Sequence, residues 1–132
     1  IGVVLCVSKK YRRGGMQMLS AELLSFIVGN LIIKNMVDRL RPCQIDETVS
    51  LIVKIPFDSS FPSGHTLNGI TAAVTLMFID KRMGIPAIVL AVLIAFSRMY
   101  NFMHFPTDVL AGAVLGVVSA VFVNFLFKRA GN

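Results

Sequence analysis

Long apolar runs separated by short polar stretches dominate this 132-residue chain. Four runs, each apolar nearly all round a helix, cover residues 16–33, 66–79, 83–96 and 109–127. The first and the last are long enough to cross a bilayer, which takes about 20 helical residues. The middle two are shorter and could be buried helices of a soluble core, but helices on the surface of a small soluble domain need a polar face, which these runs lack. The pattern therefore predicts an all-α fold, a helical bundle integral to a membrane.

A shorter apolar stretch opens the chain at residues 1–7 and cannot cross a membrane by itself. Positive charge follows this stretch instead of preceding it, which is the reverse of a secretory signal peptide. We interpret the stretch as the end of a helix that begins before Ile1. The expected architecture is four complete transmembrane helices plus the end of a truncated one. Together they would form a single membrane-embedded domain over residues 1–132, with N-terminal helices missing.

Composition and charge agree with a membrane protein and add an orientation. Hydrophobic residues make up 55% of the chain and charged residues 15%, with a formal net charge of +6. Basic residues gather at every second connection, at Lys9, Lys10, Arg12, Arg13, Lys81, Arg82, Lys128 and Arg129. The positive-inside rule places these three connections in the cytoplasm. Because the basic residues are split among separate loops, anionic lipid headgroups suit them better than a nucleic acid does.

The remaining polar residues gather on the opposite, non-cytoplasmic side. Counting the truncated helix as the first, Lys34, Asp38, Arg39 and Arg41 end the second helix, and Ser63, Gly64 and His65 begin the third. Ser97 and Arg98 end the fourth helix, and His104 and Asp108 begin the fifth. The membrane orientation rests on the basic residues of the cytoplasmic connections, so the gathering of these polar residues on one side is independent of it. We expect one site at this end of the bundle.

The cations of the second helical piece favour an anionic ligand. Lys34 and Arg41 are seven positions apart, two helical turns, so both can face one side of a helix. Cationic side chains at the edge of a bilayer are costly and tend to mark a substrate path. Snorkelling from a helix end is the alternative; it suits Arg39 and Arg41 but fits Lys34 less well, because Lys34 precedes Pro42 by two turns.

Ser63, Gly64 and His65 stand where the third helix is expected to begin. Ser63 is a good N-cap residue, and Gly64 lets a ligand approach the backbone. Free N–H groups and the positive end of the helix dipole then form an anion site, toward which His65 would project. A capping serine alone is usually structural, but a histidine beside it points to chemistry.

His104 and Asp108 are four apart at the start of the last helix, with Pro106 in its first turn. This spacing lets the carboxylate accept a hydrogen bond from one imidazole nitrogen, which leaves the other as a lone pair that can attack or bind a metal. A metal site is the poorer interpretation, because neighbouring Lys and Arg would repel a divalent cation. Three cations and a helix N-terminus describe a site for a multiply charged oxyanion, and we expect phosphate.

The longest connection, residues 43–61, combines acidic residues with an amphipathic stretch at 49–57. A loop of this length is usually a lid or a binding loop, and a plain solvated connector is an equally good interpretation. Its Cys43 and the distant Cys6 fall on opposite sides of a hydrocarbon core about 30 Å thick, so they cannot form a disulfide.

The polar residues resemble the motifs of the type 2 phosphatidic acid phosphatase superfamily, which also includes the vanadium haloperoxidases. The three motif blocks are carried by Lys34, Arg41 and Pro42; by Pro62, Ser63, Gly64 and His65; and by Ser97, Arg98, His104 and Asp108. Eleven specified positions, in order and at fixed internal spacing, are far more specific than one short motif. The blocks show no departure from the pattern. The helices that we expect before Ile1 would be the one difference from six-helix members.

The resemblance implies a role for each motif residue. His104 would be the nucleophile that forms a phosphohistidine, Asp108 would orient it, and His65 would protonate the leaving group. The phosphate oxygens would be held by Lys34, Arg41, Arg98, Ser63 and the backbone N–H of Gly64. The reaction would need neither a metal nor another cofactor.

The resemblance also implies the substrate class. Similar membrane members act on phosphatidic acid, phosphatidylglycerol phosphate or undecaprenyl diphosphate, with the site facing away from the cytoplasm; by analogy with compact prokaryotic members we favour undecaprenyl diphosphate. The haloperoxidases are soluble, which argues against their chemistry here. A non-catalytic transporter or binding protein for phosphorylated lipids is the alternative, but it leaves His65 and the His104–Asp108 spacing without a role. The expected partners are the lipid phosphate and membrane lipids, not nucleic acid, and a homo-oligomer is left open.

Overall fold

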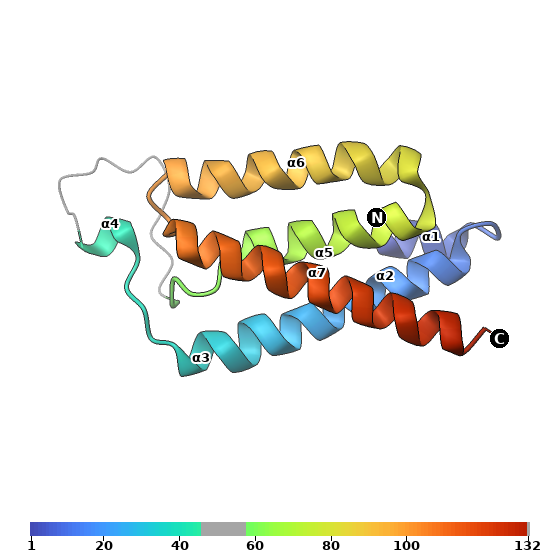
Figure 1. The fold of residues 1–132 in the computed structure, drawn as a ribbon, viewed down its shortest axis with the longest axis horizontal. Helices are drawn as coiled ribbons and strands as arrows, with labels where there is room; N and C mark the ends of the chain where they lie inside the picture. The colour runs from blue at the N-terminus through green and yellow to red at the C-terminus, as the bar shows by residue number, and fades with distance from the viewer. Residues whose placement is uncertain (46–57, 132) are drawn as a thin grey trace.

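The computed structural model describes residues 1–45 and 58–131, and the regular structure of this part is helical, without strands. Its elements are α1 (Gly2–Val7), α2 (Arg12–Ser25), the π-helix η1 (Phe26–Ile33), α3 (Lys34–Met36), α4 (Pro42–Ile45), α5 (Gly64–Ile79), α6 (Lys81–Tyr100) and α7 (Pro106–Arg129) (Figure 1). α2, η1 and α3 follow one another without a break and form one long helical run. The expected all-helical fold is confirmed.

Three helical runs in the described part are long and apolar enough to cross a membrane. They are Arg12–Met36, with 25 residues, α6, with 20, and α7, with 24; a window of 18 residues within each has a mean hydropathy of 1.6, 1.8 and 2.4, respectively. α5 is apolar but has only 16 residues, short of the about 20 that a straight crossing needs. By length the structure supports three spanning helices, where the sequence predicts four.

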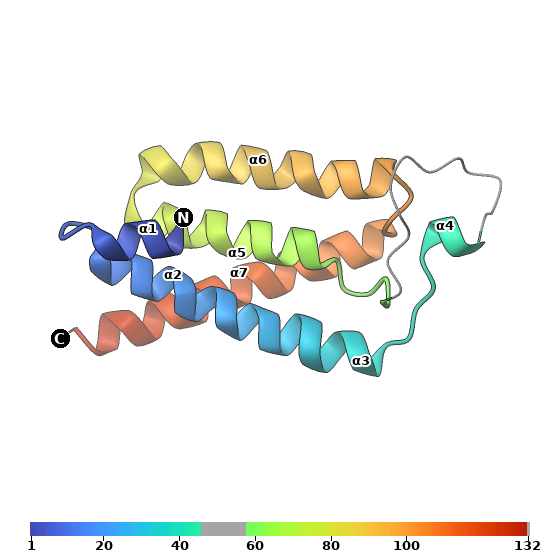
Figure 2. The same cartoon turned by 180° about the vertical axis from the view of Figure 1, so that it is seen from behind.

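α5 is the central helix of the bundle. It packs against α6, α7 and α2, whereas α6 makes few contacts with α7 (Figures 1 and 2). Two buried threonines of α5 satisfy their hydroxyls within the helix: Thr71 Oγ1 donates to Leu67 O, and Thr75 Oγ1 to Thr71 O, each at 2.8 Å. The neighbouring helices cover much of α5, and seven of its 16 residues are buried.

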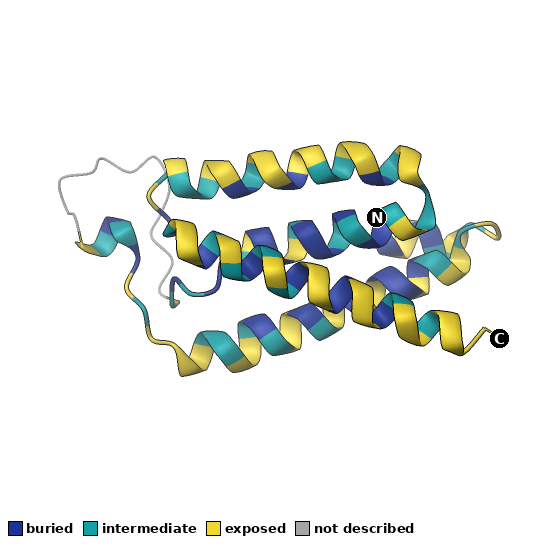
Figure 3. Ribbon diagram, in the orientation of Figure 1, coloured by how far each residue is buried: buried dark blue, intermediate teal, exposed yellow. Residues whose placement is uncertain are grey.

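The outer surfaces of α6 and α7 are apolar and exposed (Figure 3). On α6, more than half of the residue surface is exposed at Val89, Leu90, Val92, Leu93 and Phe96. A soluble protein rarely exposes so large a continuous apolar surface, because water solvates it poorly. Lipid tails are the solvent that these surfaces fit.

Two glycines let α7 approach α5 closely. A Cβ on Gly112 would lie 2.7 Å from the backbone O of Ser63, and one on Gly116 would lie 2.8 Å from that of Leu67. Two small residues four positions apart permit such a contact between membrane helices. At the same place the backbone N–H of Ser63 donates to Asp108 O at 3.0 Å. This contact sets the first turn of α5 beside the first turn of α7.

The connections alternate between the two ends of the bundle. Asp80 alone joins α5 to α6 and caps α6 by accepting a hydrogen bond from Arg82 N at 2.9 Å. Lys81 and Arg82, which the sequence places in a connection, are instead in the first turn of α6. Residues 101–105 join α6 to α7. The start of α2, the α5–α6 junction and the end of α7 lie at one end, and the end of α3, the start of α5 and residues 101–105 lie at the other (Figure 1). The basic clusters and the motif blocks therefore occupy opposite ends.

Candidate active site

A cavity of about 500 Å³ opens at the end of the bundle that carries the motif blocks. It is lined by Phe26, Asn30, Lys34, Arg41, Asp58, Gly64, His65, Asn68, Gly69, Ile94, Arg98 and His104. Residues from all three motif blocks contribute to this lining, and both histidines of the chain belong to it. The convergence expected from the sequence is present in the structure.

Among the described residues, three cationic side chains reach the cavity, each from a different part of the chain. Lys34 comes from α3, Arg98 from the last turn of α6, and Arg41 from the segment between α3 and α4. The prediction that Lys34 and Arg41 share a helix face is wrong, because the helix ends at Met36 and the backbone is extended at Val37 (φ −111°, ψ 91°). The two cations meet through a change in chain direction, not through helical spacing.

Arg41 is almost fully buried, with 2% of its surface exposed, which excludes snorkelling. Its Nη1 donates to Met103 O at 2.9 Å, and its Nε donates to Asp58 O at 3.3 Å. Its Nη2 lies 2.7 Å from Asp58 Oδ1. A buried guanidinium needs such pairing, because an uncompensated buried charge is strongly destabilising.

Asp58, which no motif block contains, lies between two of the cations. Its Oδ2 is 2.5 Å from Lys34 Nζ, and its Oδ1 is 2.7 Å from Arg41 Nη2. Burial alone would raise the pKa of Asp58, but the hydrogen bonds and charges of Lys34 and Arg41 outweigh it and hold the pKa below the ordinary 3.8. Asp58 is therefore an anion at neutral pH. The rest of its connection, residues 46–57 with the predicted amphipathic stretch, lies outside the described residues.

His104 is held by the backbone of Ser60. Its Nδ1 lies 2.8 Å from the carbonyl oxygen of Ser60; since a carbonyl only accepts, Nδ1 carries the hydrogen and Nε2 keeps its lone pair. Nε2 lies 3.3 Å from Arg41 Nη1, on the cationic side of the cavity. Burial, followed by the charge of Arg41, lowers the pKa of His104 to about 4. The imidazole is therefore neutral at pH 7 and presents an unprotonated nitrogen.

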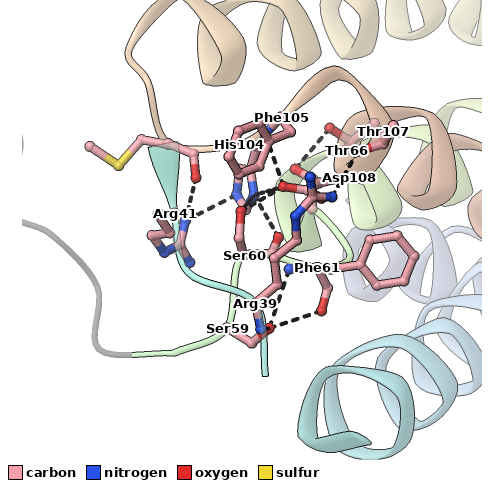
Figure 4. Close-up of polar contacts among 12 residues, drawn as sticks. Arg39, Arg41, Ser59, Ser60, Phe61, Thr66, His104, Phe105, Thr107 and Asp108 are labelled. Atoms are coloured by element: carbon pink, nitrogen blue, oxygen red, sulfur yellow. Dashed lines mark hydrogen bonds and ion pairs between the residues drawn. The ribbon is translucent and has the colours of Figure 1, made fainter. Parts of the chain in front are cut away.

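Asp108 does not bond directly to His104, contrary to the prediction from their spacing. His104 Nδ1 is 3.9 Å from Asp108 Oδ2, and Ser60 connects them: its hydroxyl donates to Asp108 Oδ2 at 2.5 Å (Figure 4). The same carboxylate accepts from Arg39 Nη1 at 2.7 Å and from the backbone N–H of Phe105 at 2.9 Å. His104 precedes the N-cap of α7, so the rule that residues four apart share a helix face does not apply to it. Asp108 is instead the N3 residue of α7, and its carboxylate accepts the backbone N–H of the N-cap residue Phe105.

Arg39 is a structural partner of Asp108, so the snorkelling interpretation is also wrong for this residue. Its Nη1 donates to Thr107 Oγ1 at 2.8 Å as well as to the carboxylate, and its guanidinium lies 4.1 Å from the ring centroid of Phe105 (Figure 4). The fully buried Asp108 therefore has a compensating charge. Together these contacts hold the turn that carries His104.

The start of α5 brings Gly64 and His65 to the cavity, but not Ser63. Ser63 occupies the N-cap position without a side-chain cap bond, and its buried hydroxyl accepts from Thr66 Oγ1 at 3.0 Å. A Cβ on Gly64 would lie 2.9 Å from Asn30 Oδ1. A side chain at this position would have to displace the amide of Asn30, which is the end of a flexible side chain.

One N–H donor of Arg98, the buried Nε, is left without a hydrogen-bond partner among the described residues. A buried donor without a partner costs about 1–3 kcal/mol. An anion in the cavity would relieve this cost, because Arg98 lines it.

Of the described residues, Asn30, Asp58 and Asn68 line the cavity but belong to no motif block, and neither does Ser60, which holds His104. Asn30 lies one turn before Lys34 on the same helical run, and Asn68 lies one turn after Gly64 on α5. Helical spacing from the motif residues could have indicated both. Asp58 and Ser60 lie in irregular chain, where no periodicity shows which side chains turn inward.

The arrangement is suited to a phosphate ester. Three cations and the N-terminus of α5 can hold anionic oxygens, and the lone pair of His104 lies among them. His65 lines the same cavity and can exchange a proton. Among the described residues, no group of three His, Cys, Asp or Glu side chains is placed to hold a metal ion.

Comparisons with known proteins point to one family. The sequence model described as PAP2 superfamily matches residues 14–131. The chain is 35% identical over 117 residues to an undecaprenyl-diphosphatase of Sulfolobus acidocaldarius, covering 88% of this chain and 56% of that protein. It is 33% identical over 100 residues to phosphatidylglycerophosphatase B of Bacillus subtilis, covering 67% of this chain and 46% of that protein. The chain thus spans about half the length of these curated relatives.

A solved structure has the same arrangement of helices. The crystal structure of a transmembrane PAP2-type phosphatidylglycerolphosphate phosphatase from Bacillus subtilis matches with a TM-score of 0.77 at 28% sequence identity. The match covers 97% of this chain and 65% of that one. The similarity therefore extends over nearly all of the helices described above.

Proposed function

Because the chain belongs to the PAP2 superfamily, the type 2 phosphatidic acid phosphatases, we propose that it is an integral-membrane lipid phosphatase. It would hydrolyse a phosphate or diphosphate ester of a lipid through a phosphohistidine intermediate. The observation that carries this proposal is the position of His104 Nε2, an unprotonated nitrogen 3.3 Å from Arg41 in a cavity with two further cations. A nucleophile placed among phosphate-binding cations is what phosphoryl transfer to a side chain requires.

In the proposed reaction Lys34, Arg41 and Arg98 hold the phosphate oxygens, together with the N–H of Gly64 at the start of α5. The lone pair of His104 Nε2 attacks phosphorus, and the bond from phosphorus to the leaving oxygen breaks with its electron pair on that oxygen. His65 donates a proton to the leaving oxygen. Water then attacks the phosphohistidine and gives a proton to His65, which releases inorganic phosphate and neutral His104.

Two motif residues take indirect roles in this proposal. Asp108 orients His104 through Ser60, whose hydroxyl it binds and whose carbonyl accepts from the imidazole. Ser63 contributes as the residue at which α5 begins, since its hydroxyl bonds Thr66 instead of facing the cavity. Both residues therefore support the position of groups that would touch the phosphate.

The names of the relatives support a lipid phosphate as the substrate class. One relative is named as a diphosphatase of undecaprenyl diphosphate and another as a phosphatase of phosphatidylglycerophosphate. We favour undecaprenyl diphosphate, with phosphatidic acid and phosphatidylglycerol phosphate as alternatives. The lipid-facing surfaces of α6 and α7 suit a substrate whose tail stays in the bilayer while its phosphate enters the cavity.

We further propose a multi-pass arrangement in the cell membrane, with residues 1–132 in one phosphatase domain. Four complete transmembrane helices, counting the short α5, would be joined by the end of another at α1. The cavity would face away from the cytoplasm. The basic clusters at the opposite end of the bundle support this orientation through the positive-inside rule (Figure 1).

Phosphate release from a panel of lipid phosphates, at matched detergent concentration, tests the proposal. The wild type should release phosphate with or without a chelator, with the highest kcat/KM on undecaprenyl diphosphate, and His104→Ala should release none. Tight binding of the lipids by the wild type without any release would favour a transporter or binding protein instead. Loss of release on chelation would contradict a metal-independent reaction.

A further inference from the structure

The cavity contains an anion that belongs to the chain itself. The two carboxylate oxygens of Asp58 lie 2.5 Å from Lys34 Nζ and 2.7 Å from Arg41 Nη2. These are two of the three cations assigned above to the phosphate oxygens. We propose that the Asp58 carboxylate takes the place of phosphate when no phosphate ester is bound, and that a phosphate ester binds by displacing it. The inference rests on the proposed function, because that function assigns the two cations to phosphate.

The exposure of the three side chains shows which of them can leave. Lys34 keeps 12% of its side-chain surface and Arg41 keeps 2%, whereas Asp58 keeps 52%. The cations are therefore anchored in the protein, and the carboxylate is the member that can turn into water. Arg41 keeps its bonds to Met103 O and to the backbone O of Asp58 when the carboxylate leaves.

Replacing the Asp58 carboxylate with another anion should cost little free energy, because the carboxylate is exposed and the two cations are buried. An ion pair with a half-exposed carboxylate contributes little, since water solvates the released anion well. Leaving Lys34 and Arg41 unpaired would be costly, because a buried charge without a partner is poorly solvated. Asp58 should therefore leave when another anion takes its place, and otherwise stay.

A phosphate ester has two advantages over the carboxylate in this competition. It carries about −1.5 to −2 charges at neutral pH and has three acceptor oxygens, whereas Asp58 carries one charge and uses two oxygens. Its third oxygen can also reach Arg98, whose Nε has no partner among the described residues. Asp58 would thus reject weakly bound anions and, after hydrolysis, would compete with inorganic phosphate and promote its release.

Asp58→Asn tests the proposal, because it keeps the size of the side chain and removes its charge. Asp38→Asn is the matched control: Asp38 is exposed beside the same region, and none of the ion pairs among the described residues involves it. Binding of inorganic phosphate and of orthovanadate to the purified protein in detergent would be measured by calorimetric titration. We expect the Kd of both anions to fall by about tenfold in Asp58→Asn and to stay unchanged in Asp38→Asn.

Equal or weaker binding of both anions to Asp58→Asn would overturn the proposal, and weaker binding would show that Asp58 positions the cations instead. Asp58→Ala provides a second test if the amide variant loses thermal stability, and the same tightening is expected from it. A wild type that binds both anions but hydrolyses no lipid phosphate would overturn the proposed function, not this inference. A wild type that hydrolyses lipid phosphate, with no tightening in either Asp58 variant, would do the reverse.

Discussion

One added methyl group at Gly112 should move α7 away from α5, and so separate His104 from Gly64 and His65. A Cβ there would lie 2.7 Å from the backbone O of Ser63 and 3.3 Å from Leu67 N, whereas ordinary contact begins at 3.4 Å. The Ser63 carbonyl cannot turn away, because it accepts from Leu67 N at 2.9 Å in the first turn of α5. In Gly112→Ala, α7 must therefore move away from α5 by several tenths of an ångström.

The cost of this movement can be separated from the effect of alanine on the helix. Overpacking of a close contact costs about 1–3 kcal/mol, while Ala in place of Gly stabilises a helix by up to about 1 kcal/mol. Gly69→Ala is the control, because its Cβ would lie 3.5 Å from Ala91 Cβ, an ordinary contact. The difference in the free energy of unfolding between the two variants should then be about 1–3 kcal/mol, with Gly112→Ala the less stable.

Activity should report the same movement with greater sensitivity. Gly64 and His65 belong to α5, whereas His104 is held at the start of α7, so separating these helices misaligns the groups that would bind and attack phosphate. A misplacement of about 1 Å can cost about 100-fold in rate. We expect kcat/KM of Gly112→Ala to fall by about 10- to 100-fold.

Unfolding by denaturing detergent in mixed micelles, followed by far-ultraviolet circular dichroism, gives the stability difference, and phosphate release gives kcat/KM. Because Gly69 lines the cavity, its variant serves only for the unfolding comparison. If Gly112→Ala were as stable as Gly69→Ala and as active as the wild type, the contact between α5 and α7 would not set the geometry of the site.

The remaining predictions concern the groups that would touch or orient the phosphate. The pKa of His104, lowered from 6.5 to about 4, can be measured by histidine-selective NMR, because the chain has only two histidines. Between these pH values the unfolded chain binds the proton and the folded chain does not, so the free energy of unfolding should fall as the pH falls from 6.5 to about 4. A pKa near 6.5 would refute the burial argument. Ser60→Ala removes the hydroxyl that joins Asp108 to the turn and keeps the carbonyl that accepts from His104. We expect the Nδ1–H tautomer of His104 to persist in NMR while kcat falls by about tenfold. Loss of that tautomer would mean that the Ser60 hydroxyl, not its carbonyl, selects it. Arg98→Lys keeps the charge but loses a planar two-pronged contact, so kcat/KM should fall substantially; full activity would show that Arg98 is no phosphate ligand. His65→Ala should hydrolyse a nitrophenyl phosphate much better than a lipid substrate, because a good leaving group needs little protonation, whereas rescue of His104→Ala by that substrate would reverse the assigned roles.

The membrane helices and the chemical inventory of the site could be predicted from the sequence alone. The runs that became α6 and α7 are apolar enough to require lipid whatever they pack against, because each residue contributes to hydropathy independently. The connection at residues 101–105 follows from the gap between these runs. Lys34, Arg41, Arg98, His65 and His104 could be assigned to one end because charge is costly in a bilayer and settles at its edges.

Which atoms meet in the site was decided by the tertiary structure. Lys34 and Arg41 do not share a helix; the chain leaves the helix at Met36 and returns Arg41 to the cavity. Ser63 turns its hydroxyl toward Thr66, although its sequence position made it a candidate phosphate ligand. Spacing alone cannot foresee either outcome, because the first depends on where the helix ends and the second on which nearby partner the hydroxyl takes.

The setting of His104 shows the same limit most clearly. Its spacing from Asp108 predicts a direct hydrogen bond, yet the bond goes to the carbonyl of Ser60, from a segment 44 residues earlier. Asp58 likewise enters between Lys34 and Arg41 from irregular chain that no motif covers. A periodic helix or strand repeats its side-chain directions and can be predicted from spacing, whereas a buried polar group in irregular chain takes whichever partner packing brings within about 3 Å.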